Sequence, residues 1–324
     1  MKSRISMISF SVLAISFCFP ARADSTTTLS QSEAQQFAKT FSPMGSAESE
    51  FLNVRVIRDI EYARYGDTVL LLDMYLPAES DQKIACVVTI TGGGFRARPK
   101  SGFAKYAAFL ATQGFASACI SYRGTPKHGF QETVYDCKAA VRYVRANAAM
   151  YNIDPDRIGV LGQSAGGHLA AMIGVSGGID HLEGDGGNPE SSSRVQAAVS
   201  FSGVFDFISR LRDGGHQKKS IELKKKTNGA WVGEPFAVDS ERWKQASPIN
   251  HLSDDDPPLL MLATKTDSVV PYHQSVQMHE AMQKKGLTSE LVILDTGGHG
   301  IASAPAIGDQ VWHATLAFLR KHLR

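Results

Sequence analysis

Two hydrophobic patterns alternate along this chain of 324 residues. Short, nearly continuous apolar runs are followed by longer stretches in which apolar residues recur every three or four positions. The clearest of the longer stretches places Val134, Cys137, Val141 and Val144 on one helical face, and 307–318 repeats the pattern. Continuous apolar runs are typical of strands buried on both faces, and the longer spacing is typical of amphipathic helices. The chain therefore predicts an α/β fold with a mostly parallel sheet and helices on both faces.

The apolar runs predict eight strands. The first two are joined by a short polar segment at 64–67 and form an antiparallel hairpin. The remaining six are each followed by a turn and, in most cases, by a helical stretch. The eight predicted strands span 54–62, 68–76, 84–90, 116–121, 158–161, 197–201, 259–263 and 291–294.

Two segments do not follow this alternation. Residues 24–50 are rich in Ser, Thr, Gln and Ala and are expected to be an N-terminal leader with one short helix. Residues 207–246 are charged, contain glycine and are expected to be a small lid insertion in a single domain over 51–324. Trp231 within this insertion has two interpretations: it stacks on a sugar or aromatic acyl group, or it lies in the core of the lid.

The N-terminus has the three-part pattern of a secretory signal peptide. Two basic residues precede an apolar run over 5–19, and alanines then occupy the −3 and −1 positions before Asp24. The run is shorter than the roughly 18 residues that a membrane span needs. We expect a signal peptide over 1–23, a mature chain from Asp24 and a secreted or periplasmic protein without a membrane partner, with an uncleaved anchor as the alternative.

The charge balance argues against a nucleic-acid partner. The chain has 34 Lys and Arg against 32 Asp and Glu, a formal charge of +2. The signal peptide carries three of the basic residues and no acid, so 31 basic and 32 acidic residues remain, a charge of −1. Binding to phosphates needs a basic excess on one face.

Three cysteines remain after the signal peptide. Cys86 and Cys119 lie in predicted strands and Cys137 lies on a helical face, with no CxxC or Cys/His metal spacing. We expect three buried, unreactive thiols and no metal; a Cys86–Cys119 bridge is the alternative.

A candidate nucleophile follows the predicted strand 158–161. The sequence Gly162-Gln163-Ser164-Ala165-Gly166 fits the pattern G-x-S-x-G and precedes a helical stretch. In this strand, turn and helix context the serine projects its hydroxyl from a sharp turn that the glycines make room for. Ser164 is therefore the predicted nucleophile.

A serine needs a base and an orienting acid, in the chain order Ser, Asp, His. Asp267 follows the seventh predicted strand and His299 follows the eighth. Loops at the carboxyl ends of parallel strands meet in one crevice, so these are the predicted acid and base. Asp295, in the same loop as His299, is the alternative acid, and His168 is expected to be structural.

The loop Thr91-Gly92-Gly93-Gly94-Phe95 follows the third predicted strand. Its glycines allow backbone N–H groups to approach a substrate closely, so Gly93, Gly94 and Ala165 are the predicted donors of an oxyanion hole. A flexible turn is the alternative interpretation of the glycines.

With these motifs the sequence resembles the α/β-hydrolase superfamily. More narrowly, it is similar to secreted bacterial esterases of the feruloyl-esterase-like, or BD-FAE-like, group, which are related to hormone-sensitive-lipase-type esterases. The resemblance runs from about Val54 to the C-terminus and rests on segments at 91–95, 136–141, 154–159, 162–170, 183–188, 246–249 and 297–300.

The resemblance implies a serine carboxylic-ester hydrolase without a cofactor. It implies an acyl-enzyme on Ser164, with His299 and Asp267 as base and acid, and acetyl or hydroxycinnamoyl esters of polysaccharides, or small acyl esters, as substrates. The chain departs from the family pattern where Thr91 replaces the usual His and Phe95 the usual Trp, which puts the support of the loop and the shape of the acyl pocket in question. A serine peptidase of the same fold and a non-catalytic binding protein are the alternative functions; the sequence leaves the natural substrate and the oligomeric state open.

Overall fold

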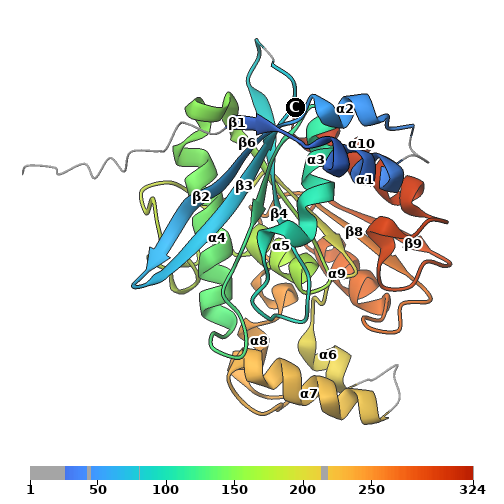
Figure 1. The fold of residues 1–324 in the computed structure, drawn as a ribbon. Coiled ribbons are helices and arrows are strands. Elements are labelled where there is room, and N and C mark those ends of the chain that lie inside the picture. Colours follow the sequence, from blue (N-terminus) through green and yellow to red (C-terminus); the bar gives the residue numbers. More distant parts are fainter. Residues whose placement is uncertain (1–25, 42–44, 80, 213–217, 324) are drawn as a thin grey trace, which may run out of the picture.

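The protein is described by a computed structural model over residues 26–41, 45–79, 81–212 and 218–323. A sheet of nine strands lies at its centre, in the order β1-β2-β3-β5-β4-β6-β7-β8-β9 (Figure 1). Strands β4 to β9 pair in parallel, whereas β1, β2 and β3 pair antiparallel and β3 also pairs antiparallel with β5. The predicted mostly parallel sheet is thus confirmed. The strands are β1 Thr26–Thr28, β2 Arg55–Tyr65, β3 Thr68–Leu76, β4 Ile84–Ile90, β5 Ala116–Ile120, β6 Ile153–Gln163, β7 Ala197–Phe201, β8 Leu259–Thr264 and β9 Ser289–Leu294.

The prediction of eight strands is wrong, because the sheet has nine. The additional strand, β1, consists of three exposed threonines that pair with β2 at the edge of the sheet. An exposed edge strand buries no side chain, so it carries none of the alternation of apolar and polar residues from which a strand is predicted. The predicted hairpin is present as β2 and β3.

Helices cover both faces of the sheet, as expected. One face packs against α1 Gln31–Phe41, α2 Glu48–Leu52, α3 Ala104–Thr112 and α10 Gly308–His322, and the other against α4 Phe130–Ala146, α5 Ala165–Val175 and α9 His273–Lys284. Alternate residues of β4 divide between the two cores: Cys86, Val88 and Ile90 face one and Ala85 and Val87 the other. Short 3-10 helices complete the chain at Lys100–Phe103, Ala148–Tyr151, Asp180–Leu182, Pro248–His251 and Ile301–Ser303.

The stretch expected as a leader contributes β1, α1 and most of α2. Phe41 at the end of α1 stacks on Phe109 of α3, with ring centroids 4.1 Å apart, and meets the Trp312 ring of α10 edge-on at 5.8 Å. Burial of a phenylalanine side chain contributes about 1.5–3 kcal/mol. These contacts attach α1 to the helical layer of the domain.

The insertion at 207–246 lies between β7 and β8 and includes α6 Phe207–Arg212, α7 Lys218–Val232 and α8 Glu241–Gln245. In Figure 1 these helices lie together beyond one end of the sheet. Trp231 is fully buried, its ring stacks on Phe95 with centroids 3.8 Å apart, and its indole N–H donates to the Thr133 hydroxyl at 3.0 Å. The structure thus supports the interpretation of Trp231 as lid core and leaves no ring face for a sugar.

The three cysteines among the described residues are free and buried. Cys86 and Cys119 lie on the neighbouring strands β4 and β5, but Cys86 pairs with Ala116, three residues before Cys119. Their side chains also belong to the cores on opposite faces of the sheet, so they cannot form a bridge. The prediction that these cysteines are buried is confirmed, and burial raises the pKa of the Cys86 and Cys119 thiols to about 12.

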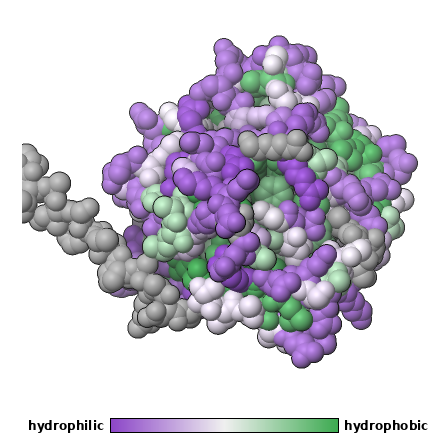
Figure 2. Space-filling model, turned by 90° about the horizontal axis from the view of Figure 1, so that it is seen from above, coloured by the Kyte–Doolittle hydropathy of each residue, from purple (hydrophilic) through white to green (hydrophobic). Residues whose placement is uncertain are grey.

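Hydrophilic side chains cover most of the face seen in Figure 2, and hydrophobic ones form smaller areas between them. Among the described residues, the large hydrophobic side chains that are exposed lie on separate helices and loops: Leu52, Met150, Leu223, Val238 and Val269. In the described part of the chain, no helix has both the length and the apolar character that a membrane crossing needs.

Candidate active site

Ser164 lies in a tight turn between β6 and α5. Its backbone has φ 59° and ψ −120°, a left-handed conformation that costs a non-glycine residue about 1–3 kcal/mol. The turn leaves no room for side chains at two neighbouring positions. A Cβ atom on Gly162 would lie 2.2 Å from the carbonyl oxygen of Gly166, and one on Gly166 would lie 2.1 Å from that of Ile90. The glycines of the motif therefore permit the turn that projects the serine hydroxyl.

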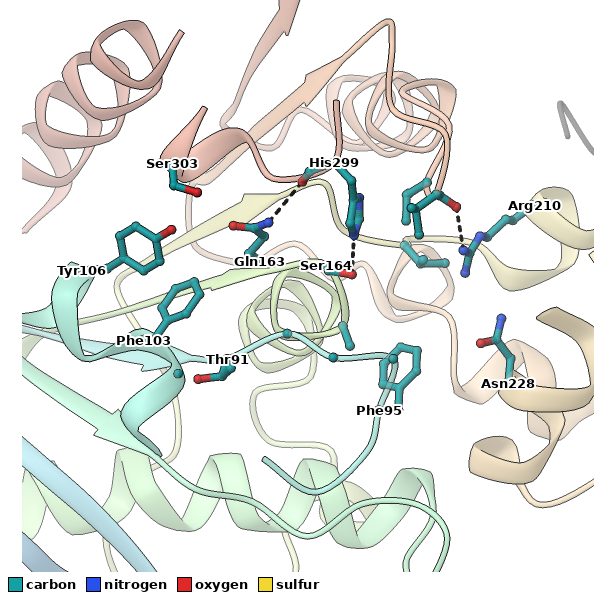
Figure 3. A pocket seen from close by; sticks show the side chains of 18 of the residues that line it. Thr91, Phe95, Phe103, Tyr106, Gln163, Ser164, Arg210, Asn228, His299 and Ser303 are labelled. Carbon is teal, nitrogen blue, oxygen red and sulfur yellow. Dashed lines mark hydrogen bonds between the residues drawn. The ribbon is translucent and has the colours of Figure 1, made fainter. Parts of the chain in front are cut away.

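The structure brings together the three residues predicted from the strand ends. The Oγ atom of Ser164 lies 2.7 Å from Nε2 of His299, and Nδ1 of His299 lies 2.8 Å from Oδ2 of Asp267 (Figure 3). Residues far apart in the sequence thus form one continuous chain of hydrogen bonds. This arrangement allows the imidazole to take a proton from the serine while the carboxylate orients the ring and stabilises its charged form.

The Asp267 carboxylate is buried and fully engaged. Its second oxygen, Oδ1, accepts the backbone N–H groups of Val269 and Val270 at 2.7 and 2.9 Å. Burial alone raises the pKa of this carboxyl, but the hydrogen bond and charge of His299 and the two backbone donors outweigh it and hold the pKa below its ordinary value. Asp267 therefore remains ionised beside His299 at neutral pH.

The alternative acid, Asp295, lies elsewhere. Its side chain is 81 % exposed and pairs with Lys265 at 2.7 Å. The hydrogen bond to His299 belongs to Asp267.

The predicted oxyanion loop turns sharply beside Ser164. Gly93 and Gly94 have φ of 141° and 64°, and a Cβ atom on Gly93 would lie 2.0 Å from Nε of Arg98. Both glycines line one cavity together with Ser164, Ala165 and His299. Within the described residues, no backbone hydrogen bond engages the N–H groups of Gly93, Gly94 or Ala165. These three N–H groups are thus unengaged, and their role in an oxyanion hole stays a prediction.

Two contacts support the loop where the chain departs from the family pattern. The Tyr122 hydroxyl donates to the carbonyl oxygen of Thr91 at 2.6 Å, which fixes the start of the loop. At its end, Phe95 stacks on the buried ring of Trp231. Thr91 and Phe95 thus leave a loop that is anchored at both ends.

The cavity around Ser164 has a volume of about 530 Å³. Figure 3 shows that its walls differ on the two sides of the serine. Phe103, Tyr106 and Ser303 lie on one side, and Arg210 and Asn228 of the insertion lie on the other.

Sequence reasoning did not identify several of these residues. Gln163, beside the nucleophile, donates its amide N–H to the carbonyl oxygen of His299 at 3.1 Å and so connects the serine turn to the histidine loop. Arg210 and Asn228 belong to a charged stretch that resembles a solvent-exposed face in sequence. The structure places Arg210 in the wall of the cavity, where it bonds to Val269, 59 residues away.

His168 is structural, as expected. It is fully buried, its Nδ1 atom lies 2.8 Å from the carbonyl oxygen of Val204, and its ring packs edge-on against Phe95 and Trp231. Burial lowers the pKa of His168 to about 3 from an ordinary value of 6.5. The imidazole is therefore neutral in the folded protein.

Acid should weaken the fold through this histidine. Below pH 6.5 the unfolded chain binds a proton that the folded chain rejects until about pH 3, so the free energy of unfolding should fall by up to about 1.4 kcal/mol per pH unit in that window. Above pH 6.5 the contribution of His168 to the free energy of unfolding does not change with pH. Denaturant titrations of the wild type and of His168→Asn across the window measure this; the variant, which cannot titrate, should show the smaller pH dependence. Equal slopes would contradict the assignment.

The segment at 183–188 is a structured loop tied to α4. The Glu183 carboxylate accepts hydrogen bonds from Lys138 at 2.6 Å and from Arg142 at 3.3 Å, and Arg142 also donates to the carbonyl oxygen of Gly187. Among the described residues, no group of three or more His, Cys, Asp or Glu side chains is placed to hold a metal ion.

The chain is similar to known ester hydrolases in sequence and in fold. The probable carboxylic ester hydrolase LipM of Mycobacterium tuberculosis is 33% identical over 220 residues, which cover 67% of this chain and 49% of LipM. The chain thus spans about half the length of that relative. A bifunctional GH43-CE protein of Bacteroides eggerthii superposes with a TM-score of 0.73 at 29% identity, covering 83% of this chain and 38% of that one. A truncated carbohydrate esterase from gut microbiota superposes with a TM-score of 0.72 at 28% identity, covering 82% of this chain and 95% of that one.

The BD-FAE family model matches residues 72–282, which is more than half of the chain. The match extends from β3 through the serine turn to α9 and includes Asp267. Together with the sheet topology, this match shows that the chain belongs to the BD-FAE family of the α/β-hydrolase superfamily.

Proposed function

We propose that this chain is a serine carboxylic-ester hydrolase that acts through an acyl-enzyme on Ser164. The observation that carries the proposal is the hydrogen-bonded chain from Ser164 through His299 to Asp267, beside a loop with unengaged backbone donors. The names of LipM, a probable carboxylic ester hydrolase, and of the superposed carbohydrate esterase support it.

The reaction follows from the positions of these groups. His299 Nε2 accepts the proton of Ser164 as the serine oxygen attacks the ester carbonyl carbon. The carbonyl oxygen becomes negatively charged and binds the N–H groups of Gly93, Gly94 and Ala165. The protonated His299 then gives its proton to the alcohol oxygen, the alcohol leaves, and a water molecule activated by the same histidine releases the acid from Ser164.

Acetyl or hydroxycinnamoyl esters carried by polysaccharides are the proposed substrates, with small acyl esters as the simpler members of the same class. The carbohydrate-esterase titles of the superposed structures support this choice. The proposal also includes export. The predicted signal peptide at 1–23 and the predicted mature start at Asp24 lie outside the described residues. They are the basis on which we propose a periplasmic or secreted enzyme.

A fluorophosphonate probe should label the purified protein covalently at Ser164, because only an activated serine attacks the phosphorus centre. The same preparation should hydrolyse p-nitrophenyl acetate, acetylated xylan or feruloylated oligosaccharides. Intact-protein mass spectrometry after labelling, with heat-denatured protein as the control, measures the adduct. A folded protein that stays unlabelled and inactive is a binding protein, and faster turnover of peptides than of esters identifies a peptidase.

A further inference from the structure

The insertion places basic and amide side chains at one end of the cavity, opposite the aromatic wall. Arg210 at the end of α6 and Asn228 of α7 line the cavity (Figure 3). Lys224, one turn before Asn228, donates to the same carbonyl oxygen as Arg210, that of Val269, at 2.7 Å. We call Arg210, Lys224 and Asn228 the basic corner.

Arg210 is a buried cation without an ion pair among the described residues. The residue is 8% exposed, and one terminal nitrogen donates to the carbonyl oxygen of Val269 at 3.0 Å. Its Nε atom is buried and has no hydrogen-bond partner. The carboxylate that acts on its charge is Asp267, whose two oxygens are already bonded to His299, Val269 and Val270.

The other members of the basic corner increase the excess of donors. Asn228 is 7% exposed, and its amide nitrogen is buried without a partner. Burial and the neighbouring charge of Arg210 lower the pKa of Lys224 to about 8, and burial lowers that of Arg210 to about 10. Two cations therefore share one protein acceptor, the Val269 carbonyl oxygen, and the amide nitrogen of Asn228 has none.

A purely structural role explains only part of this arrangement. Arg210 and Lys224 hold the carbonyl of Val269, whose N–H in turn bonds Asp267, so they support the acid loop. That role does not use Nε of Arg210 or the amide of Asn228. A buried cation and buried donors are costly unless an acceptor pairs with them, and the planar fork of a guanidinium matches a carboxylate.

We propose that the basic corner binds a carboxylate carried by the ester substrate, with Arg210 as the main contact and Asn228 as a second donor. The proposal rests on the ester-hydrolase function and deepens it by naming a substrate class. The carboxylate belongs either to the acyl half, as in a monoester of a dicarboxylic acid, or to the alcohol half, as in an acetylated uronic acid.

Matched pairs of small esters test the proposal. On the acyl side, the monomethyl esters of succinate, glutarate and adipate are compared with methyl 4-methylpentanoate, 5-methylhexanoate and 6-methylheptanoate, which replace the carboxylate by an isopropyl group of the same shape. On the alcohol side, O-acetylglycolate is compared with isobutyl acetate. The wild type should prefer the anionic ester in at least one pair, with kcat/KM higher by roughly 10- to 100-fold. This ratio corresponds to the free energy that a hydrogen bond to a charged group contributes to binding.

Variants separate recognition of the carboxylate from support of the acid loop. Arg210→Met should lower the ratio of kcat/KM for the anionic to the neutral ester by about 10-fold or more, and Asn228→Leu should lower it less. Loss of support for Asp267 would slow both members of a pair alike and leave the ratio unchanged. Lys226 lies on the exposed side of α7, the helix that carries Asn228. Lys226→Met is therefore the matched control and should keep the wild-type ratio.

The outcomes distinguish this inference from the function on which it rests. If the protein hydrolyses none of these esters and no p-nitrophenyl ester, the proposed function itself fails. If it hydrolyses the neutral esters but shows no anionic preference in any pair, or keeps the preference in Arg210→Met, the inference is overturned and the esterase function stands. A preference on either the acyl or the alcohol side that Arg210→Met abolishes supports the proposal and identifies the half that carries the carboxylate.

Discussion

Replacement of Ser164 by alanine should lower kcat/KM for p-nitrophenyl butyrate by at least about 10³-fold. The variant keeps the cavity and the backbone donors but lacks the only oxygen within hydrogen-bonding distance of His299 Nε2 among the described residues. Without it no acyl-enzyme forms, and the remaining rate comes from binding and from the donors alone. Initial rates at several substrate concentrations measure the loss.

Ser303→Ala is the matched control for this experiment. Ser303 lines the same cavity but lies on its aromatic side, away from the hydrogen bond between Ser164 and His299. Its replacement should change kcat/KM by only a few-fold. Equal turnover by Ser164→Ala and the wild type would show that Ser164 is not the nucleophile. If Ser164→Ala loses activity but unfolds at the same temperature as the wild type, the loss comes from the chemistry and not from the fold.

Replacement of Asp267 by asparagine should lower kcat by about 10³- to 10⁴-fold. An amide nitrogen in place of Oδ2 donates where the carboxylate accepts, so it favours the histidine tautomer whose Nε2 already carries a proton. That nitrogen cannot then take the proton of Ser164, to which it lies 2.7 Å away. The pre-steady-state release of p-nitrophenol should slow in proportion.

Asp295→Asn provides the comparison on the acid side. This carboxylate is 81 % exposed and pairs with Lys265 at the surface, where water screens the two charges. Its loss should leave kcat within about two-fold of the wild type, because it touches neither His299 nor the cavity. If kcat fell more in Asp295→Asn than in Asp267→Asn, Asp295 and not Asp267 would be the acid that orients His299.

The sequence predicts Ser164, Asp267 and His299 because each follows a strongly apolar strand. Parallel strands bring their carboxyl ends to one edge of the sheet, so the order of the strands along the chain already implies that these residues meet. The glycines at 92–94 and around Ser164 were equally informative, since each marks backbone that a side chain would obstruct. The alternation of apolar strands and amphipathic helices also predicts the α/β fold class. It does not predict the edge strand β1.

The remaining features depend on contacts that leave no periodic signal. Strand β1 has only polar, exposed residues, and its pairing with β2 is a property of the edge of the sheet. The sequence around Trp231 fits a substrate-facing ring as well as a buried one, and only the contact with Phe95 decides between them. Arg210 and Asn228 lie in a charged stretch, where sequence alone does not distinguish a cavity wall from a solvated helix.

The insertion touches both the glycine loop at 91–95 and the aspartate loop at 267–270, and this limits how members of the family can be re-engineered. Trp231 packs on Phe95 at the end of the glycine loop, while Arg210 and Lys224 hold the carbonyl of Val269 in the aspartate loop. A chimera that receives this segment from a relative would acquire a new pocket wall and, at the same time, lose both anchors. Transplanting substrate preference within the family therefore requires Phe95 and the loop at 267–270 to be exchanged together with the insertion as one unit.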